Sequence, residues 1–490
     1  MTLLRDPELI KIKSYIGGRW IGSSSTFDVT NPSTGEVIAQ VADCTTAHAQ
    51  KAVEAAQTAF HSWSKKSASK RGYLLKRWNT LIMKHQDDLA TIMTLEQGKP
   101  LAEAKGEIAY ASSFIDWFAE EGRRIYGETI PAPDSDKRLI VIKQPVGVVA
   151  AITPWNFPSS MITRKAAPAL AAGCSFVVRP ASKTPLSALA LAYLAEQAGI
   201  PAGVFNVVAG KDSHGIGKVF TESPKVAKFS FTGSTATGKQ LLKQCASTVK
   251  KVSLELGGNA PFIVFDDADI DAAVAGAIVS KYRNTGQTCV CANRFLIQRN
   301  VQDQFAEKLA RAAQALSVGD GMDPGVKIGP LVNAQALSDV EQLVRESVAT
   351  GAEIVLGGDR HSRGGLFFNP TILKNVTNEM PVAANEIFGP VAPLITYDTE
   401  EEALSIANDT EFGLAAYFYT QDIGRIWRVA EQLEYGMVGI NEGLISSTVA
   451  PFGGVKQSGL GREGSHYGID EYLEIKYLCM GGINKKEEIL

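Results

Sequence analysis

Cysteine and histidine are scarce in this chain, and it has no long apolar run. The 490 residues include 6 cysteines and 6 histidines. Six cysteines in a chain of this length do not make the disulfide framework of a secreted protein, so we expect a reducing, cytoplasmic environment. No histidine stands at a metal-ligand spacing from another histidine or a cysteine, which argues against a metal site. The best apolar run, 146–152, is far too short to cross a bilayer.

An excess of charge of either sign is also missing. The net charge is −3 and the sequence pI is about 6.2. This balance gives no electrostatic basis for binding nucleic acid or an anionic membrane. Residues 1–15 lack the apolar core of a signal peptide and the composition of a transit peptide. With 45% hydrophobic and 21% charged residues, the chain is typical of a compact protein, and its length predicts two or three structural units.

Strand-like and helical patterns alternate through most of the chain. Residues 14–43 indicate short strands and turns, and residues 47–122 carry apolar side chains at helical spacing. From 146 onward, short apolar runs alternate with helices, as in parallel sheets covered by helices. We therefore expect an α/β fold with two doubly wound, open-sheet domains and a small oligomerisation arm. The first domain is expected to span 1–124 and 146–257, the second 258–469, and the arm 125–145 and 470–490.

Several segments of the second half have especially clear patterns. We expect helices near 270–282, 301–316 and 333–350 and a strand at 353–356. Residues 471–478 indicate an edge strand that could pair with another subunit.

One cysteine and one glutamate lie in settings that suit covalent catalysis. Cys289 ends the Gly- and Thr-rich turn 284–289, and Glu255 lies in the apolar, Gly-flanked segment 254–258. A thiol can act as the nucleophile and a carboxylate can later activate water. Partial burial would raise the pKa of Glu255 and suit it to act as a base near neutral pH. Each feature alone is equally consistent with a buried cysteine or with a glutamate at the end of a strand.

Two further strings could bind an oxyanion and a phosphate. Asn156 stands in Pro-Trp-Asn-Phe-Pro at 154–158, and an amide on such a rigid turn can donate to a developing oxyanion. An asparagine beside prolines is also a common turn former. The Gly-rich segment 231–238 follows a strand-like run and opens a helix, so its N–H groups could bind a phosphate. It departs from the usual Gly-x-Gly-x-x-Gly pattern, and an ordinary strand–helix turn is the alternative.

Together with Glu-Ile-Phe-Gly-Pro at 386–390, these strings in this order resemble the aldehyde dehydrogenase superfamily, over nearly the whole chain. The resemblance implies that Cys289 adds to an aldehyde carbon, and that the thiohemiacetal loses hydride to a nicotinamide to leave a thioester. It implies that Asn156 stabilises the oxyanion and that water activated by Glu255 releases the acid. The first domain would then bind the dinucleotide, and the second would supply the thiol.

The resemblance also implies a set of residues around the dinucleotide: Thr153, Pro154, Trp155, Arg179, Ser182, Gly233, Ser234, Gly257, Glu386 and Phe388. Glu386 would accept from ribose hydroxyls, and Phe388 would pack beside the nicotinamide. The family usually has Lys where this chain has Arg179, and Arg keeps the positive charge and adds a planar fork suited to phosphate. Ser182 leaves room for a 2′-phosphate that an acidic residue would repel. We therefore expect NADP or NAD as the cofactor, with NADP favoured.

Three residues near the thiol are candidates for substrate binding. Arg164 follows the Pro-Trp-Asn-Phe-Pro string, Arg283 stands six residues before Cys289, and Ser446 lies in a later loop. Two arginines beside a thiol would bind a distal carboxylate well. These segments most resemble the succinate-semialdehyde dehydrogenases of the superfamily. That resemblance implies oxidation of succinate semialdehyde to succinate in 4-aminobutyrate degradation.

Other functions fit the same residues. Glutarate semialdehyde is one methylene longer, and pockets discriminate single methylenes poorly. A broad-specificity aliphatic aldehyde dehydrogenase would have structural arginines. Hydrolysis of esters or thioesters by Cys289 without cofactor is a further alternative. A non-catalytic member of the fold would be expected to have lost Cys289 or Glu255.

Two expectations concern regulation and assembly. Cys291 is either a packing residue or a redox partner that forms a reversible, strained disulfide with Cys289. The resemblance implies a homodimer or homotetramer, built through the arm.

Overall fold

The structure, a computed structural model, describes residues 4–483. Buried apolar runs form a first open sheet, in which β7, β8, β9, β10 and β11 are parallel neighbours. Antiparallel strands close both edges of this sheet. In spatial order its strands are β19 (Gly459–Leu460), β11 (Lys251–Glu255), β10 (Val226–Thr232), β7 (Val148–Ile152), β8 (Ser175–Arg179), β9 (Phe205–Val207), β1 (Ser14–Ile16) and β2 (Arg19–Ile21).

A second open sheet is built from the later part of the chain. All its neighbouring strands are parallel except β14, which runs antiparallel to β15. In spatial order its strands are β14 (Glu353–Leu356), β15 (Thr371–Lys374), β16 (Val391–Tyr397), β13 (Ala292–Gln298), β12 (Ala260–Val264), β17 (Ala415–Tyr419) and β18 (Met437–Ile440).

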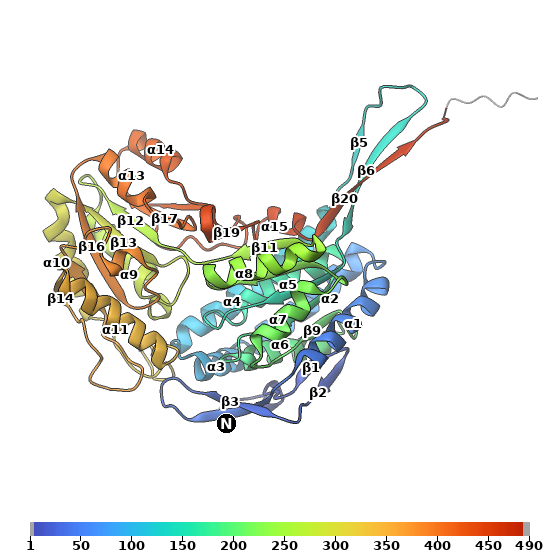
Figure 1. The fold of residues 1–490 in the computed structure, drawn as a ribbon, viewed down its shortest axis with the longest axis horizontal. Helices are drawn as coiled ribbons and strands as arrows, with labels where there is room; N and C mark the ends of the chain where they lie inside the picture. The colour runs from blue at the N-terminus through green and yellow to red at the C-terminus, as the bar shows by residue number, and fades with distance from the viewer. Residues whose placement is uncertain (1–3, 484–490) are drawn as a thin grey trace, which may run out of the picture.

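Helices flank both sheets, as Figure 1 shows. The first half contains α1 (Thr46–Trp63), α2 (Ala68–Lys84), α3 (Gln86–Gln97), α4 (Leu101–Glu121), α5 (Ser160–Ala172), α6 (Pro185–Gln197), α7 (Ser213–Glu222) and α8 (Thr235–Cys245). The second half contains α9 (Ile270–Tyr282), α10 (Gln302–Gln314), α11 (Ala334–Ala349), α12 (Pro381–Ala384), α13 (Glu400–Asn408), α14 (Ile423–Gln432) and α15 (Tyr467–Asp470). None of the helices within 4–483 is long and apolar enough to cross a membrane.

A third sheet forms an arm that projects from the body of the molecule (Figure 1). Its antiparallel strands are, in spatial order, β20 (Leu473–Met480), β6 (Arg138–Pro145) and β5 (Glu128–Ile130). A separate hairpin pairs β3 (Thr26–Thr30) with β4 (Val37–Ala42). The predicted α/β class with two open sheets and an arm is confirmed. The predicted domain boundaries stay a prediction; residues 1–3 and 484–490 of those ranges lie outside the described residues.

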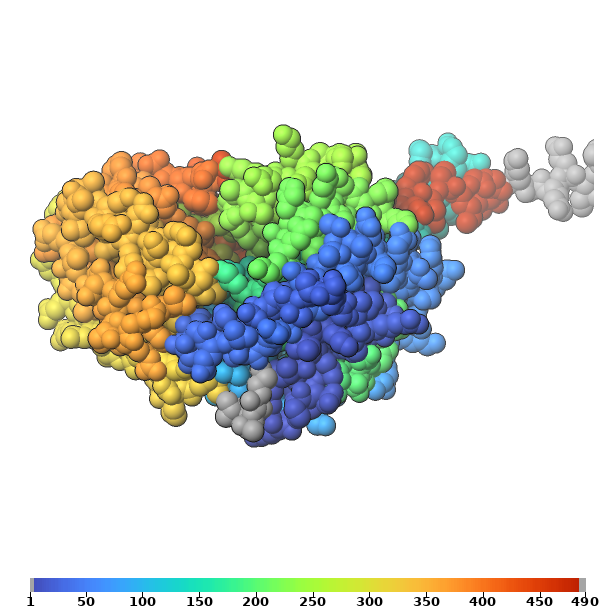
Figure 2. Space-filling model, turned by 60° about the horizontal axis from the view of Figure 1, so that its bottom comes forward, coloured from blue at the N-terminus to red at the C-terminus, as the bar shows by residue number. Residues whose placement is uncertain are grey.

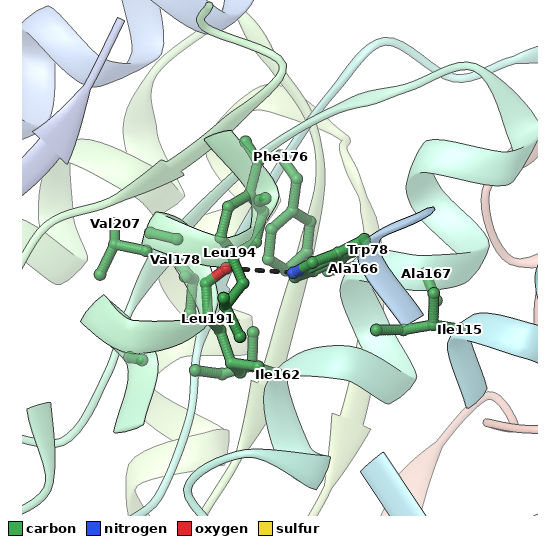
Figure 3. Packing of buried hydrophobic residues seen from close by; sticks show 14 of the residues in the cluster. Trp78, Ile115, Ile162, Ala166, Ala167, Phe176, Val178, Leu191, Leu194 and Val207 are labelled. Carbon is green, nitrogen blue, oxygen red and sulfur yellow. Dashed lines mark hydrogen bonds between the residues drawn. The ribbon is translucent and has the colours of Figure 1, made fainter. Parts of the chain in front are cut away.

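The core of the first sheet fixes the helix that carries much of the site. Ile162 and Ala166 of α5 pack with Phe176 of β8 and with Trp78, as Figure 3 shows. The buried Trp78 indole donates to the Leu191 carbonyl at 3.1 Å, so its polar atom is satisfied within the apolar cluster. This packing leaves α5 no freedom to rotate about its axis, and it therefore fixes the side chains that α5 presents on its other face.

The two sheets lie in two lobes. Figure 2 shows the yellow-to-orange second half beside the blue-to-green first half, with the arm extending away from both. The short strand β19 comes from the C-terminal part of the chain yet pairs with β11 of the first sheet, at Glu255↔Gly459. The chain therefore returns across the junction of the lobes next to the predicted base.

Candidate active site

The predicted nucleophile follows a strained loop between α9 and β13. Asn284 and Thr285 have φ values of 51° and 58°, and Gly286 continues in the same left-handed region at 76°. For a β-branched residue such as Thr285 this conformation is unfavourable, and it persists only where the surroundings hold it. Only glycine fits at position 286, because a Cβ there would lie 2.2 Å from the Gly389 carbonyl oxygen. The loop places Cys289, half-buried, where two cavities meet.

The first cavity, of about 240 Å³, brings most of the predicted cofactor residues to Cys289. Its lining comes from the turn after β7, the start of α8, the turn after β11 and the loop before β16. The lining residues are Pro154, Trp155, Asn156, Met161, Thr232, Gly233, Ser234, Leu256, Gly257, Cys289, Glu386 and Phe388.

These residues fit the nicotinamide end of a dinucleotide. Trp155 and Phe388 meet edge to face at 5.7 Å between ring centroids and form an apolar wall. Glu386 accepts from the Gly258 N–H at 3.1 Å with one oxygen, and burial raises the pKa of this carboxyl to about 7. A Cβ on Gly257 would lie 2.8 Å from the other oxygen, so glycine keeps that carboxylate accessible. The Ser234 side chain caps α8, whose N-terminus faces this cavity, as phosphate binding requires.

The second cavity, of about 30 Å³, lies on the other side of Cys289 and contains all three predicted substrate residues. Its lining is Tyr110, Phe157, Ser160, Met161, Arg164, Arg283, Thr288, Cys289, Val290, Ser446 and Phe452. Arg283 lies over the Phe157 ring at 5.4 Å, and it forms no ion pair within residues 4–483. The buried Tyr110 hydroxyl has no hydrogen-bond partner among the described residues. Free donors therefore point into a small pocket beside the thiol.

Arg164 is held differently from Arg283. Its side chain is 1% exposed, forms an ion pair with Glu463 and lies over the Phe452 ring at 4.5 Å. Glu463 also accepts from Lys165, so one carboxylate neutralises two adjacent cations. The Arg164 Nη2 has no hydrogen-bond partner among the described residues. That half of the guanidinium is still free to bind an anion in the second cavity.

Asn156 lines the first cavity with its side chain toward the thiol loop. Its Nδ2 donates to the Gln287 carbonyl at 3.0 Å, which uses one of its two N–H bonds. The side chain lines the first cavity together with Cys289. The remaining N–H is therefore available to an oxyanion formed on a carbon attached to the thiol.

Glu255 ends β11 beside β19 and is 2% exposed. Burial and the neighbouring Glu463 carboxylate raise its pKa well above the ordinary value, against the opposing charges of Arg164 and Lys165. Glu255 does not line either cavity. Its Oε2 has no hydrogen-bond partner in the described chain. An unpartnered buried carboxyl with a raised pKa is suited to receive a proton.

The two cysteines of the thiol loop have different surroundings. Burial raises the pKa of the Cys289 thiol to about 12, against the charge of Arg164, so the resting nucleophile is protonated. Cys291 is 7% exposed, and its Sγ donates to the Lys281 carbonyl at 3.4 Å. Both cysteines are free thiols. The suggested disulfide between them stays a hypothesis.

Three predicted cofactor residues lie outside the first cavity. The Thr153 hydroxyl is buried without a partner among residues 4–483. Arg179 is 6% exposed, and its Nη2 donates to the Gly210 carbonyl at 2.9 Å. Ser182 lines a separate hollow of about 600 Å³, shared with Lys183, Lys211 and acidic residues that include Asp43 and Glu96.

Sequence reasoning missed several residues of the site. Tyr110 and Glu463 were not predicted as site residues, and the packing of α4 and of the loop after β19 brings them to α5. Phe157 lies within the quoted string around Asn156 and Met161 lies three residues after it, so proximity to Asn156 could have found them. No group of three or more potential metal ligands is present in the described part of the chain.

Comparison with known proteins identifies the lineage of this site. The profile described as "Aldehyde dehydrogenase family" matches residues 20–478. The chain is 59% identical to a 3-sulfolactaldehyde dehydrogenase from Pseudomonas putida, over 99% of this chain and 100% of that protein. It is 58% identical to a glutarate-semialdehyde dehydrogenase from Pseudomonas aeruginosa, over 98% and 100% of the two chains.

It is also 58% identical to the NADP(+) succinate-semialdehyde dehydrogenase of Escherichia coli, over 98% of this chain and 99% of that protein. A solved structure described as an E. coli NADP dependent enzyme superposes with a TM-score of 0.97 at 58% identity, covering 98% of this chain and 100% of the other.

Proposed function

This chain belongs to the aldehyde dehydrogenase family and is an NAD(P)-dependent oxidoreductase that acts on aldehydes; we propose that it oxidises succinate semialdehyde to succinate. The observation that carries the proposal is the second cavity, where Arg164 and Arg283 lie beside Cys289. Guanidinium groups match the geometry of a carboxylate, and a small cavity suits a short chain between the carboxylate and the aldehyde.

The residues act in sequence. Cys289 attacks the aldehyde carbon from the junction of the two cavities, and its proton passes to water as the C–S bond forms. The free N–H of Asn156 stabilises the oxygen that becomes negative. A nicotinamide bound in the first cavity supplies the hydride acceptor, and a thioester on Cys289 remains. Glu255 then takes a proton from water, which attacks the thioester carbon and releases the acid and the thiol.

The relatives support an anionic tail on the substrate. The printed names of the three relatives mention sulfolactaldehyde, glutarate semialdehyde and succinate semialdehyde. Each of these aldehydes carries a sulfonate or carboxylate group, which an arginine pair can bind. Glutarate semialdehyde remains the nearest alternative substrate, since one methylene changes binding by only about 1–3 kcal/mol. A role in 4-aminobutyrate breakdown stays a prediction.

Replacing Arg283 with Met tests the carboxylate role. Arg283 has no ion pair in the described chain, so its loss breaks no salt bridge. We expect the KM for succinate semialdehyde to rise on the order of 10- to 100-fold, because a hydrogen bond to a charged group contributes about 1.5–3 kcal/mol. The KM for butanal, which lacks the carboxylate, should stay within about 3-fold. Equal effects on both aldehydes would instead support the broad-specificity alternative.

We also propose that NADP is the preferred cofactor. Arg179 donates to the Gly210 carbonyl, so one nitrogen of its guanidinium group is already bound to the protein. Ser182 shares its hollow with Lys183 and Lys211, two lysines that the prediction did not include. The Lys183 ammonium lies 5.9 Å from the Trp155 ring centroid, on the side of the first cavity. Asp43 and Glu96 share the hollow, and the two lysines supply the positive charge that a 2′-phosphate at Ser182 would need.

Replacing Lys183 with Gln should therefore weaken NADP binding about 10-fold and leave NAD binding within about 2-fold, because only NADP carries the extra phosphate. Quenching of intrinsic fluorescence would measure both dissociation constants without turnover. Lys218 of α7 is an exposed lysine outside the hollow, and Lys218→Gln is the matched control. Equal weakening of NAD and NADP by Lys183→Gln would contradict this assignment.

Assembly through the arm is a further part of the proposal. Strand β20 pairs with β6 along its full length, and apolar side chains of β20 such as Ile475 and Tyr477 are 73% and 58% exposed. An exposed apolar strand is a liability in a monomer, and a second copy would cover it. We propose a homodimer or homotetramer.

A further inference from the structure

The backbone carbonyl of Asn156 accepts hydrogen bonds from two side chains that line neither cavity. Lys99 Nζ donates to it at 2.7 Å and Asn284 Nδ2 donates at 3.0 Å. The side chain of Asn156 donates to the Gln287 carbonyl of the thiol loop, which also accepts from Asn284 Nδ2 at 3.2 Å. The direction of the Asn156 amide therefore depends on two donors that touch neither cavity.

Lys99 is itself fixed by a buried partner. It lies in the link between α3 and α4, its side chain is 1% exposed, and its ammonium forms an ion pair with Glu107 of α4 at 2.5 Å. The other oxygen of Glu107 accepts from the N–H groups of Ser159 and Ser160 at 3.0 and 3.2 Å. One carboxylate thus joins Lys99 to the first turn of α5, immediately after the turn that carries Asn156.

The same segment holds the strained part of the thiol loop. Glu103 accepts from the Asn284 N–H at 2.8 Å, and Gln97 Nε2 donates to the Asn284 side-chain oxygen at 3.0 Å. Gln97 Oε1 also accepts from the Lys99 N–H at 2.9 Å. Residues 97–107 therefore form hydrogen bonds both to the turn that carries Asn156 and to Asn284, the left-handed residue at the start of the thiol loop.

Packing alone does not explain a charged residue at position 99. Burying an ammonium carries a desolvation penalty that an ion pair often fails to offset, and a methionine of similar length would fill the same space. The ion pair does supply direction, because it fixes the Lys99 ammonium in a place from which another of its three N–H bonds reaches the Asn156 carbonyl. Lys99 also lies 4.0 Å from the centre of the Phe157 ring, which lines the second cavity.

We propose that Lys99 is a positioning residue of the reaction, which orients the Asn156 amide by holding the Asn156 carbonyl against Asn284. The inference rests on the proposed roles of Asn156 and Cys289. It predicts that Lys99 affects the rate of the chemical steps through Asn156, and has little effect on binding of substrate or cofactor.

A double-mutant cycle separates this role from a structural one. Lys99→Met should lower kcat on the order of 100-fold with KM within about 3-fold, since small misplacements of reacting groups cost rates of this order. Asn156→Ala should lower kcat about 10²- to 10³-fold. If Lys99 acts through Asn156, the double variant should be no more than about 3-fold slower than Asn156→Ala alone. Independent, multiplicative losses would overturn the proposal.

Lys228→Met is the matched control for losing a buried ion pair. Lys228 is 0% exposed, pairs with Glu471 at 3.2 Å and lines neither cavity. Both lysine variants should lower Tm, and only Lys99→Met should lower kcat. A fall in Tm without a fall in kcat for Lys99→Met would overturn the inference and leave the proposed chemistry intact. An unchanged kcat in Asn156→Ala would instead contradict the proposed oxyanion role.

A milder variant guards against failure to fold. Gln97→Met removes the hydrogen bonds that join Lys99 to Asn284 and leaves the Lys99–Glu107 pair in place. It should lower kcat about 10-fold, and it should have no further effect in the Asn156→Ala background. An unchanged kcat in folded Gln97→Met would contradict the inference that residues 97–107 position the loop at Asn284.

Discussion

Cys289→Ala should abolish aldehyde oxidation, with kcat falling on the order of 10⁴-fold or more, because the loss of a catalytic nucleophile leaves only binding and electrostatic contributions. Cys289 is the cysteine that lines both cavities, so its Sγ is within reach of a substrate on one side and a cofactor on the other. Initial rates of NADP reduction with succinate semialdehyde would measure the loss. The dissociation constant of NADP, from fluorescence quenching, should change less than about 3-fold.

Two other cysteines provide controls for this experiment. Cys174 is fully buried, donates to the Tyr472 carbonyl at 3.4 Å and lies in the core of the first sheet. Cys174→Ala should lower Tm and leave kcat within about 2-fold. Cys291→Ala distinguishes the two thiols of the loop. If Cys291→Ala is inactive while Cys289→Ala keeps its activity, the nucleophile has been assigned to the wrong residue.

Most of the architecture could be predicted from sequence because the patterns are local. The helix predicted at 270–282 and the strand at 353–356 match α9 and β14, and the edge strand expected at 471–478 corresponds to β20. Helix α5 was not predicted. Its residues 160–172 are buried on every side, so they have no polar face to reveal a helical period, and Pro168 lies inside it.

The candidate site also contains some residues that the sequence could predict and others that it could not. Residues within the quoted strings, such as Asn156 and Phe388, meet Cys289 in one cavity as the resemblance implied. The residues that control them could not be found, because Lys99 and Glu463 depend on long-range packing. Lys99 reaches Asn156 across 57 positions, and Glu463 reaches Lys165 across 298. A single sequence contains no local signal for such pairs.

Glu255→Gln should separate the two halves of the reaction. If Glu255 activates water only after hydride transfer, the variant should still form its thioester and release about one equivalent of reduced cofactor per site in a rapid burst. Steady-state turnover should then fall about 10²- to 10⁴-fold, since general-base catalysis contributes that much. Stopped-flow absorbance of the reduced nicotinamide would resolve both phases. A variant without a burst would show that Glu255 is needed before hydride transfer.

The pH dependence gives the same assignment an independent test. Burial and the adjacent Glu463 raise the pKa of Glu255 well above its ordinary value, so the protonated, inactive base persists to a higher pH than in an exposed glutamate. Turnover by the unmodified enzyme should therefore rise with pH through that raised pKa and level off above it. In Glu255→Gln the residual turnover should lose this dependence, because the titrating group is gone. If the rise persisted unchanged in Glu255→Gln, another group would be the base, and the unpartnered Glu255 carboxyl would need a different explanation.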